Sequence, residues 1–231
     1  MQKTYKQERS VYALKITGIT VRKSFSMEEE IANAVTHGLG VLLGIAALVI
    51  FAIKGAKTQN ALYTVSMMIY SVSTIVLYAN SMFYHAFKEG KTKNVFERLD
   101  HLSIYILIAG SYTPLCLIAI GGIKGIILCG IQWALAIVGV TFKAIWIDRF
   151  VKIHVLIYLI MGWTISFFIS SIFRSISFTG FYLLLAGGLA YSIGVLFYVF
   201  NWFKYHHLVW HVFVLAGSIL IFLSLYLFVG I

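Results

Sequence analysis

Seven long apolar runs, separated by short polar breaks, dominate the pattern along this chain. The runs lie near residues 35–53, 63–87, 101–120, 123–142, 153–173, 179–200 and 208–230. Each is close to the length of about 20 residues that a membrane-spanning helix needs. Strands of a membrane barrel alternate apolar and polar residues, whereas residues 45–53 are continuously apolar. The pattern predicts an all-α membrane protein with a bundle of seven transmembrane helices.

The composition excludes an ordinary soluble protein. Of the 231 residues, 61% are apolar and only 11% are charged, whereas a soluble domain has about 25% charged residues. Disorder requires the opposite composition. Seven spans use roughly 140 residues, which leaves no room for a second folded domain. We therefore expect an N-terminal cytoplasmic segment at 1–34 and one transmembrane domain at 35–231.

The basic residues are divided unequally between the two sides of the membrane. The net charge is +10, and fourteen of the 18 Lys and Arg residues fall in the N-terminal segment and the loops on its side. The other four are Lys54, Lys57, Lys124 and Arg174. Cytoplasmic loops carry the excess of basic residues, so we expect the N terminus in the cytoplasm and the C terminus outside. Because these charges adjoin spans, the expected partners are membrane lipids and not nucleic acid; no protein partner or oligomeric state is predicted.

Polar residues gather at one predicted membrane depth, near the cytoplasmic face. An ionisable residue at the centre of a span costs roughly 2.5–3.5 kcal/mol on insertion scales, so each one needs an explanation. A closed ring of seven helices would place the last helix beside the first and let these residues converge. They are Glu30, Asn33 and His37 in the first span, Ser81 and His85 in the second, Asp100 and His101 at the start of the third, and His206, His207 and His211 at the start of the seventh.

The spacing of His207 and His211 is that of a metal-ligand pair. Residues four apart on a helix share a face, whereas His206 points elsewhere. His85 is the natural third ligand, which would leave one position open for water, as in a catalytic zinc site. Asp100 is then a candidate to accept a proton, and Ser81 can hydrogen-bond to the water or to a substrate carbonyl.

Structural interpretations of the same residues remain open at this point. Histidines beside Trp202 and Trp210 suit an interfacial aromatic belt. Asp100 can be the N-cap residue of the third helix, and Ser81 can hydrogen-bond to its own helix. Glu30 can be a first-turn charge that the helix dipole favours. The seventh histidine, His154, stands alone at the start of the fifth span and is expected to be interfacial.

Two local features predict the shape and packing of the helices. Pro114 lies inside the third apolar run and should kink that helix, because proline removes a backbone donor. Gly40 and Gly44 form a G-x-x-x-G pattern in the first run, which allows close approach of a neighbouring helix.

Taken together, three motifs resemble those of one family. They are E-x-x-N-x-x-x-H at residues 30–37, S-x-x-x-H followed by an aspartate at residues 81–100, and H-x-x-x-H at residues 207–211. In this order, on seven spans, they resemble the hemolysin III proteins, the bacterial branch of the progestin and adipoQ receptor (PAQR) family. The resemblance runs from about residue 27 to the end of the chain.

The resemblance implies a site and a chemistry. It implies a seven-helix bundle with the N terminus inside and a zinc ion held by His85, His207 and His211, with Ser81 and Asp100 beside the zinc and its water. We expect residues that support this site, namely Glu30, Asn33, His37 and His101. Ceramidase-type amide hydrolysis is proposed for the receptors, and the bacterial members are linked to haemolysis and to membrane fluidity homeostasis. Ceramide and receptor adaptors do not transfer, because bacterial membranes seldom contain ceramide and this chain lacks a long cytoplasmic domain.

Three functional hypotheses follow from these observations. The first is a zinc-dependent hydrolase of a lipid amide or ester in the bacterial plasma membrane. The second is a non-enzymatic sensor of membrane state, or a receptor, in which zinc staples helices together. The third is a cytolysin. No span carries a polar stripe, and this observation argues against a pore.

The residues before Met27 match no pattern that we recognise. The run MEEEIANAVTHG, which begins at Met27, resembles a typical start for the family. We hypothesise that Met27 is the native initiator. Mass spectrometry of the native protein should then find no peptide from residues 1–26, and detection of one would reject the hypothesis.

Overall fold

The computed structural model describes residues 25–146 and 150–230, and over these ranges the chain is helical, without strands. Seven helical segments are long and apolar enough to cross a membrane, as the hydrophobic pattern predicted. They are α1 (Met27–Thr58), α2 (Ala61–Ala86), α3 (Lys91–Pro114) continued by the π-helix η1 (Leu115–Ile120), α4 (Gly122–Ile145), α5 (Val151–Trp163) continued by the 3₁₀ helix η2 (Thr164–Phe168) and α6 (Ile169–Ser175), α7 (Phe178–Val199) and α8 (His206–Phe228).

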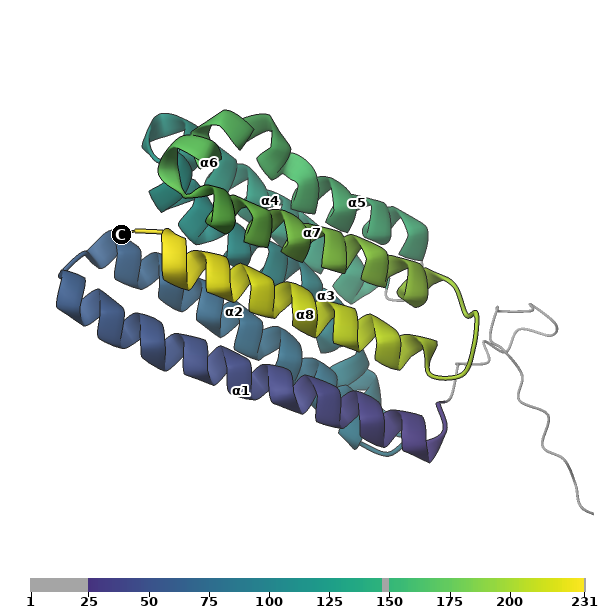
Figure 1. Ribbon diagram of the computed structural model, residues 1–231. Helices are drawn as coiled ribbons and strands as arrows, with labels where there is room; N and C mark the ends of the chain where they lie inside the picture. The colour runs from purple at the N-terminus through teal and green to yellow at the C-terminus, as the bar shows by residue number, and fades with distance from the viewer. Residues whose placement is uncertain (1–24, 147–149, 231) are drawn as a thin grey trace, which may run out of the picture.

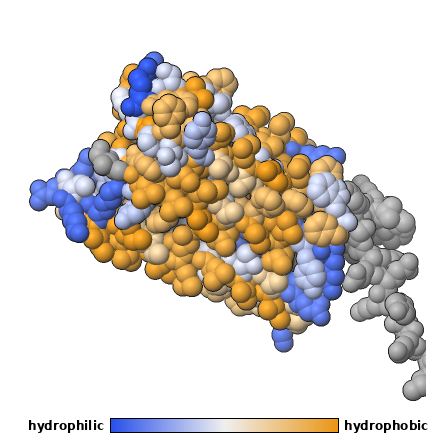
Figure 2. Space-filling view, in the orientation of Figure 1, coloured by the Kyte–Doolittle hydropathy of each residue, from blue (hydrophilic) through white to orange (hydrophobic). Residues whose placement is uncertain are grey.

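The spans lie side by side and close into a ring, so that α8 packs between α7 and α1 (Figure 1). The last span therefore lies beside the first, as convergence of the polar residues requires. Apolar side chains cover the middle of the visible surface, and hydrophilic residues gather at the two ends (Figure 2). An apolar belt between two polar ends is the surface expected of a multi-pass membrane protein. Helices can face the hydrocarbon because their backbone hydrogen bonds are satisfied internally.

Side-chain caps explain where several helices begin. Ser26 and Glu29 form a capping box at the start of α1, in which the serine hydroxyl accepts from Glu29 N and the glutamate accepts from Ser26 N. Asn60 caps α2, and Ser177 caps α7. Phe25 and Ser26 precede Met27 and take part in this structure, whereas residues 1–24 lie outside the described ranges; initiation at Met27 stays a prediction.

The third span starts ten residues before the apolar run that predicted it. Helix α3 begins at Lys91, with Gly90 as its N-cap residue, so Asp100 lies in the third turn of the helix. The interpretation of Asp100 as a helix cap is therefore wrong. The first three turns are polar (KTKNVFERLD) and leave no hydropathy signal, although nothing in them breaks a helix.

Two spans depart from regular α-helix. At Pro114 the α3 helix gives way to a π-helical turn, which ends with a bond from Gly121 N to Cys116 O. Proline lacks the amide hydrogen that would continue the regular ladder, so the predicted disturbance takes this form. The fifth span is interrupted by η2, for which the sequence offered no proline or other clear signal.

Close contact between α1 and α2 depends on the two predicted glycines. A Cβ atom built on Gly40 would lie 2.2 Å from the Tyr78 ring, and one on Gly44 would lie 2.7 Å from the Ile75 side chain. Tyr78 is fully buried, and its hydroxyl donates to Ser218 Oγ on α8 at 2.7 Å. The glycines thus allow one tyrosine to join α1, α2 and α8.

We predict that Gly40→Ala destabilises the bundle, because its methyl group must displace the buried Tyr78 ring. Overpacking of this kind costs about 1–3 kcal/mol. Gly38→Ala is the matched control on the same helix, since its Cβ would lie 3.5 Å from Met82 Sδ, an ordinary contact. Thermal unfolding of the purified protein in detergent should show a lower midpoint for Gly40→Ala alone. Equal midpoints for the two variants would contradict the packing argument.

Candidate metal centre

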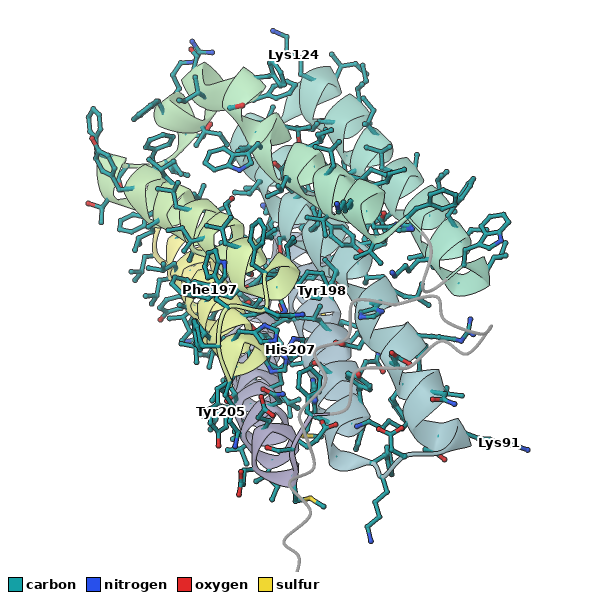
Figure 3. All side chains as sticks on the ribbon, turned by 90° about the vertical axis from the view of Figure 1, so that its right-hand side faces the viewer. Lys91, Lys124, Phe197, Tyr198, Tyr205 and His207 are labelled. Carbon is teal, nitrogen blue, oxygen red and sulfur yellow. The ribbon has the colours of Figure 1, made fainter. Side chains whose placement is uncertain are left out.

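Three histidines from two helices meet at one end of the bundle. His85 lies in the last turn of α2, and His207 and His211 lie in the first two turns of α8. Each offers a ring nitrogen, and these atoms lie within 4.8 Å of one another. Figure 3 looks onto this end of the bundle and places His207 among the converging helices. The structure brings together the three residues that the sequence singled out as metal ligands.

A carboxylate from α1 supports His85 from behind. Glu30 Oε2 lies 2.6 Å from His85 Nδ1, which leaves Nε2 for a ligand. That Nε2 atom is buried and has no hydrogen-bond partner among the described residues. Histidines that bind metals almost always engage their other nitrogen with a carboxylate or carbonyl. Glu30 therefore has the position expected of a supporting residue, and it does more than complement the helix dipole.

His211 is held in a similar way. Its Nδ1 lies 3.3 Å from the main-chain oxygen of Asn33, which again leaves Nε2 for a ligand. The His37 ring stacks on the His211 ring with centroids 3.5 Å apart and an interplanar angle of 10°. The Tyr78 ring in turn packs against His37 in a T-shaped pair. Asn33 and His37 thus orient His211 through a carbonyl and a stacked ring.

Phe25 covers the cluster, and the sequence did not predict this. Its ring centroid lies 4.8 Å from that of His207 and 5.7 Å from that of His85. Glu29 ties the two neighbouring helix starts together, since its Oε1 accepts from Tyr205 N at 3.1 Å. A hydropathy pattern cannot reveal the contact of Phe25 with the histidines, because Phe25 is isolated from the apolar runs.

Lys93 is a second residue that the sequence did not single out. It was counted among the basic loop residues, but it is buried in the first turn of α3 and its ammonium lies 2.9 Å from Glu30 Oε1. Nothing in the sequence distinguishes it from its exposed neighbour Lys91.

Ser81 and Asp100 lie beside the cluster and line one cavity together with His37, His101, His207 and His211. The cavity has a volume of about 220 Å³, and its lining, which is mostly apolar, comes from six of the seven spans. It reaches Leu115 on η1, and the 15 residues of helix from Asp100 to Leu115 measure about 22 Å. Ser81 makes no hydrogen bond to its own helix within the described residues, unlike Ser71 and Ser73. Its interpretation as a back-bonding serine is therefore not supported.

The two remaining histidines face other partners. His206 points away from the cluster, as predicted, and its Nδ1 lies 2.8 Å from the Phe197 carbonyl oxygen. His154, which was expected to be interfacial, lies in the first turn of α5 and is buried, with Nδ1 at 2.7 Å from the Tyr105 hydroxyl. Tyr105 lies on α3, so only the tertiary structure brings it close to His154 on α5.

The donor set fits a transition-metal ion. Two of the three imidazoles have one nitrogen engaged by an oxygen atom, and Nε2 of His85 has no other partner in the part of the chain that the structure describes. Three imidazoles with one open position suit zinc and several other transition metals. The fold and the site define a seven-span membrane protein with a buried histidine cluster.

Comparison with known proteins agrees with this description. The family model described as "Haemolysin-III related" matches residues 25–222. A Hemolysin-3 homolog of Bacillus subtilis (strain 168) is 44% identical over 84% of this chain and 91% of its own length. Hemolysin-3 of Bacillus cereus is 42% identical over 88% of this chain and 93% of its own length. The human protein Monocyte to macrophage differentiation factor is 26% identical over 82% of this chain and 80% of its own length.

The chain belongs to the haemolysin-III related family. The resemblance drawn from the three motifs is thereby confirmed, and the human relative agrees with the wider PAQR relationship.

We predict that the purified protein binds about one transition-metal ion per chain, and that His207→Ala/His211→Ala loses it. Both imidazoles offer nitrogens to the same point, so their removal leaves a single histidine ligand. Plasma mass spectrometry of protein purified without chelators measures the metal content. His154→Ala is the matched control, because it removes a buried histidine that contacts Tyr105 and not the cluster. A folded wild type without metal would exclude the metal centre.

Proposed function

We propose that this protein is a zinc-dependent hydrolase of lipid amides or esters, acting at the cytoplasmic side of the cell membrane. The observation that carries the proposal is the continuity of one cavity. Ser81 and Asp100 line it beside His207 and His211, and most of its other lining residues are apolar. A lipid has the same two parts, a polar head with a scissile bond and a long apolar chain.

The apolar part of the cavity favours an acyl chain. Leu107, Leu115, Ile172 and Ile221 are among its lining residues. Its length of about 22 Å is most of the hydrocarbon thickness of roughly 30 Å. Burial of each methylene group favours binding by about 0.8 kcal/mol when it leaves water, although a chain that enters from lipid gains less. The substrate class is therefore an acyl lipid, with its amide or ester group at the histidines.

The chain's own residues can perform the remaining steps of hydrolysis. A zinc ion, when bound, lowers the pKa of its water to about 7 and polarises a carbonyl. Asp100 would accept the proton of the attacking water and transfer it to the leaving nitrogen or oxygen as the bond to the acyl carbon breaks. Ser81 would donate a hydrogen bond to the substrate carbonyl oxygen. Glu30 and the Asn33 carbonyl would hold the ligand histidines in place.

A sensor with a structural metal is the second candidate. The cluster joins α2 to α8, and Glu30 adds α1, so a metal there would staple three helices. Cytolysis, which the name Hemolysin-3 attributes to the Bacillus cereus protein, finds less support, because the cavity is lined mainly by apolar residues. Such a lining disfavours the passage of ions.

We predict that the zinc-loaded protein in nanodiscs releases fatty acid from an N-acyl amine or an acylglycerol, and that Asp100→Asn reduces this turnover by at least about 100-fold, the lower range for loss of a general base. The amide keeps the size of the carboxylate but cannot accept the proton. His211→Ala should abolish turnover together with metal binding. Mass spectrometry of the released acid measures each rate.

Glu97→Gln provides the control, since it makes the same chemical change one turn earlier on α3, at a residue that does not line the cavity. Asp100→Asn must still bind zinc for its loss of turnover to identify the proton acceptor. Metal-loaded wild type that releases no acid from either lipid would exclude the hydrolase and favour the sensor. Full turnover by His211→Ala would exclude the metal mechanism.

A further inference from the structure

We infer that Lys93 is a positioning residue of the metal centre, which acts on His85 through Glu30. The inference rests on the metal site of the proposed function and deepens it by assigning a role to a residue outside the family motifs. Lys93 does not line the cavity, and the hydrogen bonds that its ammonium makes among the described residues go to Glu30, Tyr84 and Phe87 and not to the three histidines. The side chain that links it to His85 by hydrogen bonds is Glu30.

The Lys93 ammonium is held at one point by three oxygen atoms. Its Nζ lies 2.9 Å from Glu30 Oε1, 2.8 Å from Tyr84 O and 3.3 Å from Phe87 O. An ammonium group has three donors, and each has an acceptor here. The side chain is almost fully buried at 6% exposure, and the centroid of the Tyr84 ring lies 4.7 Å from the ammonium nitrogen. A surface lysine has none of these constraints.

The same ammonium fixes both partners of the His85 hydrogen bond. Tyr84 and Phe87 flank His85 at the end of α2, so two of the bonds hold the turn that carries the histidine. The third bond holds Glu30 on α1. The carboxylate thus gives Oε1 to Lys93 and Oε2 to His85 Nδ1, which fixes its rotation.

The charge of Lys93 matters because Glu30 is mostly buried, with a side-chain exposure of 14%. A buried carboxylate without a cationic partner pays a desolvation cost, so removal of Lys93 favours rotation of Glu30 toward water. An ionised carboxylate can only accept hydrogen bonds. While Lys93 keeps the Glu30 carboxylate in place, Nδ1 of His85 carries the proton and Nε2 is available to a metal ion.

A purely structural role is the competing explanation, since two bonds of Lys93 clamp the end of α2. The two roles differ in a double-mutant cycle. A residue that acts through Glu30 has no further effect once Glu30 has been replaced, whereas an independent clamp adds its own effect.

The test is zinc affinity, measured by competition with a chromogenic chelator on the full-length purified chain. Glu30→Gln should weaken zinc binding by about 10–100-fold, the usual range for a residue that supports a ligand. We expect a similar effect, at the lower end of that range, from Lys93→Met. The variant with both changes should bind zinc within about twofold of Glu30→Gln alone. Lys91→Met is the control, because Lys91 is exposed and points away from the bundle (Figure 3).

Lys93→Gln tests the same point if Lys93→Met does not fold, since its amide can still donate to the α2 carbonyls but carries no charge. Wild-type affinity in a folded Lys93 variant would overturn the inference. So would effects that multiply in the double variant, which would identify Lys93 as a clamp of the helix end.

Nitrogen-15 NMR of histidine-labelled, zinc-free protein provides a readout that is independent of the metal. Wild type and Lys91→Met should show His85 protonated at Nδ1, and Lys93→Gln should lose this preference. An unchanged His85 signal in Lys93→Gln would overturn the positioning role. A wild type with the expected signal but no zinc binding would overturn the proposed function alone.

Discussion

The hydrogen bond between Glu30 and His85 is the interaction on which the organisation of this site depends. It joins α1 to α2 over 2.6 Å at the polar end of the bundle. Buried polar groups are costly unless they are paired, and the bond pairs Nδ1 of His85 but leaves Nε2 without a partner among the described residues. Nε2 of His85 is therefore a buried nitrogen that the described residues leave free to bind a ligand. A bound metal ion is the simplest group that would satisfy it.

The histidine cluster adjoins a long cavity, and this position decides which ligands could reach it. Asp100 and the histidines line one part of a cavity whose other lining residues are mainly apolar, an arrangement that suits the proposed lipid substrate. The closed ring makes this possible, because α8 brings His207 and His211 against α1 and α2, while α3, α5 and α7 supply most of the cavity lining. Apolar walls also lower the local dielectric constant, which strengthens charge-based interactions inside the cavity.

The limits of prediction from sequence follow from what each signal measures. Hydropathy reports transfer into lipid, so it located all seven spans but not the polar turns of α3 that precede the apolar run. The spacing of three and four residues placed Glu30, Asn33 and His37 on one face, and the contacts of these residues with the cluster bear this out. The burial of Lys93 could not be predicted from the sequence, because its partner Glu30 lies 63 residues away along the chain. The partner of His154 was hidden for the same reason.

Three consecutive glutamates at the start of α1 show how local helix geometry builds a tertiary site. Successive residues on a helix point about 100° apart, so Glu28, Glu29 and Glu30 face three different surroundings. Glu28 pairs with Lys204 in an exposed contact that contributes little. Glu29 caps α1 and also accepts from Tyr205 N, which sets the start of α8 beside that of α1. Glu30 then meets His85 at the depth where α8 presents His207 and His211, so one helical turn fixes both the register of the helices and the orientation of the site.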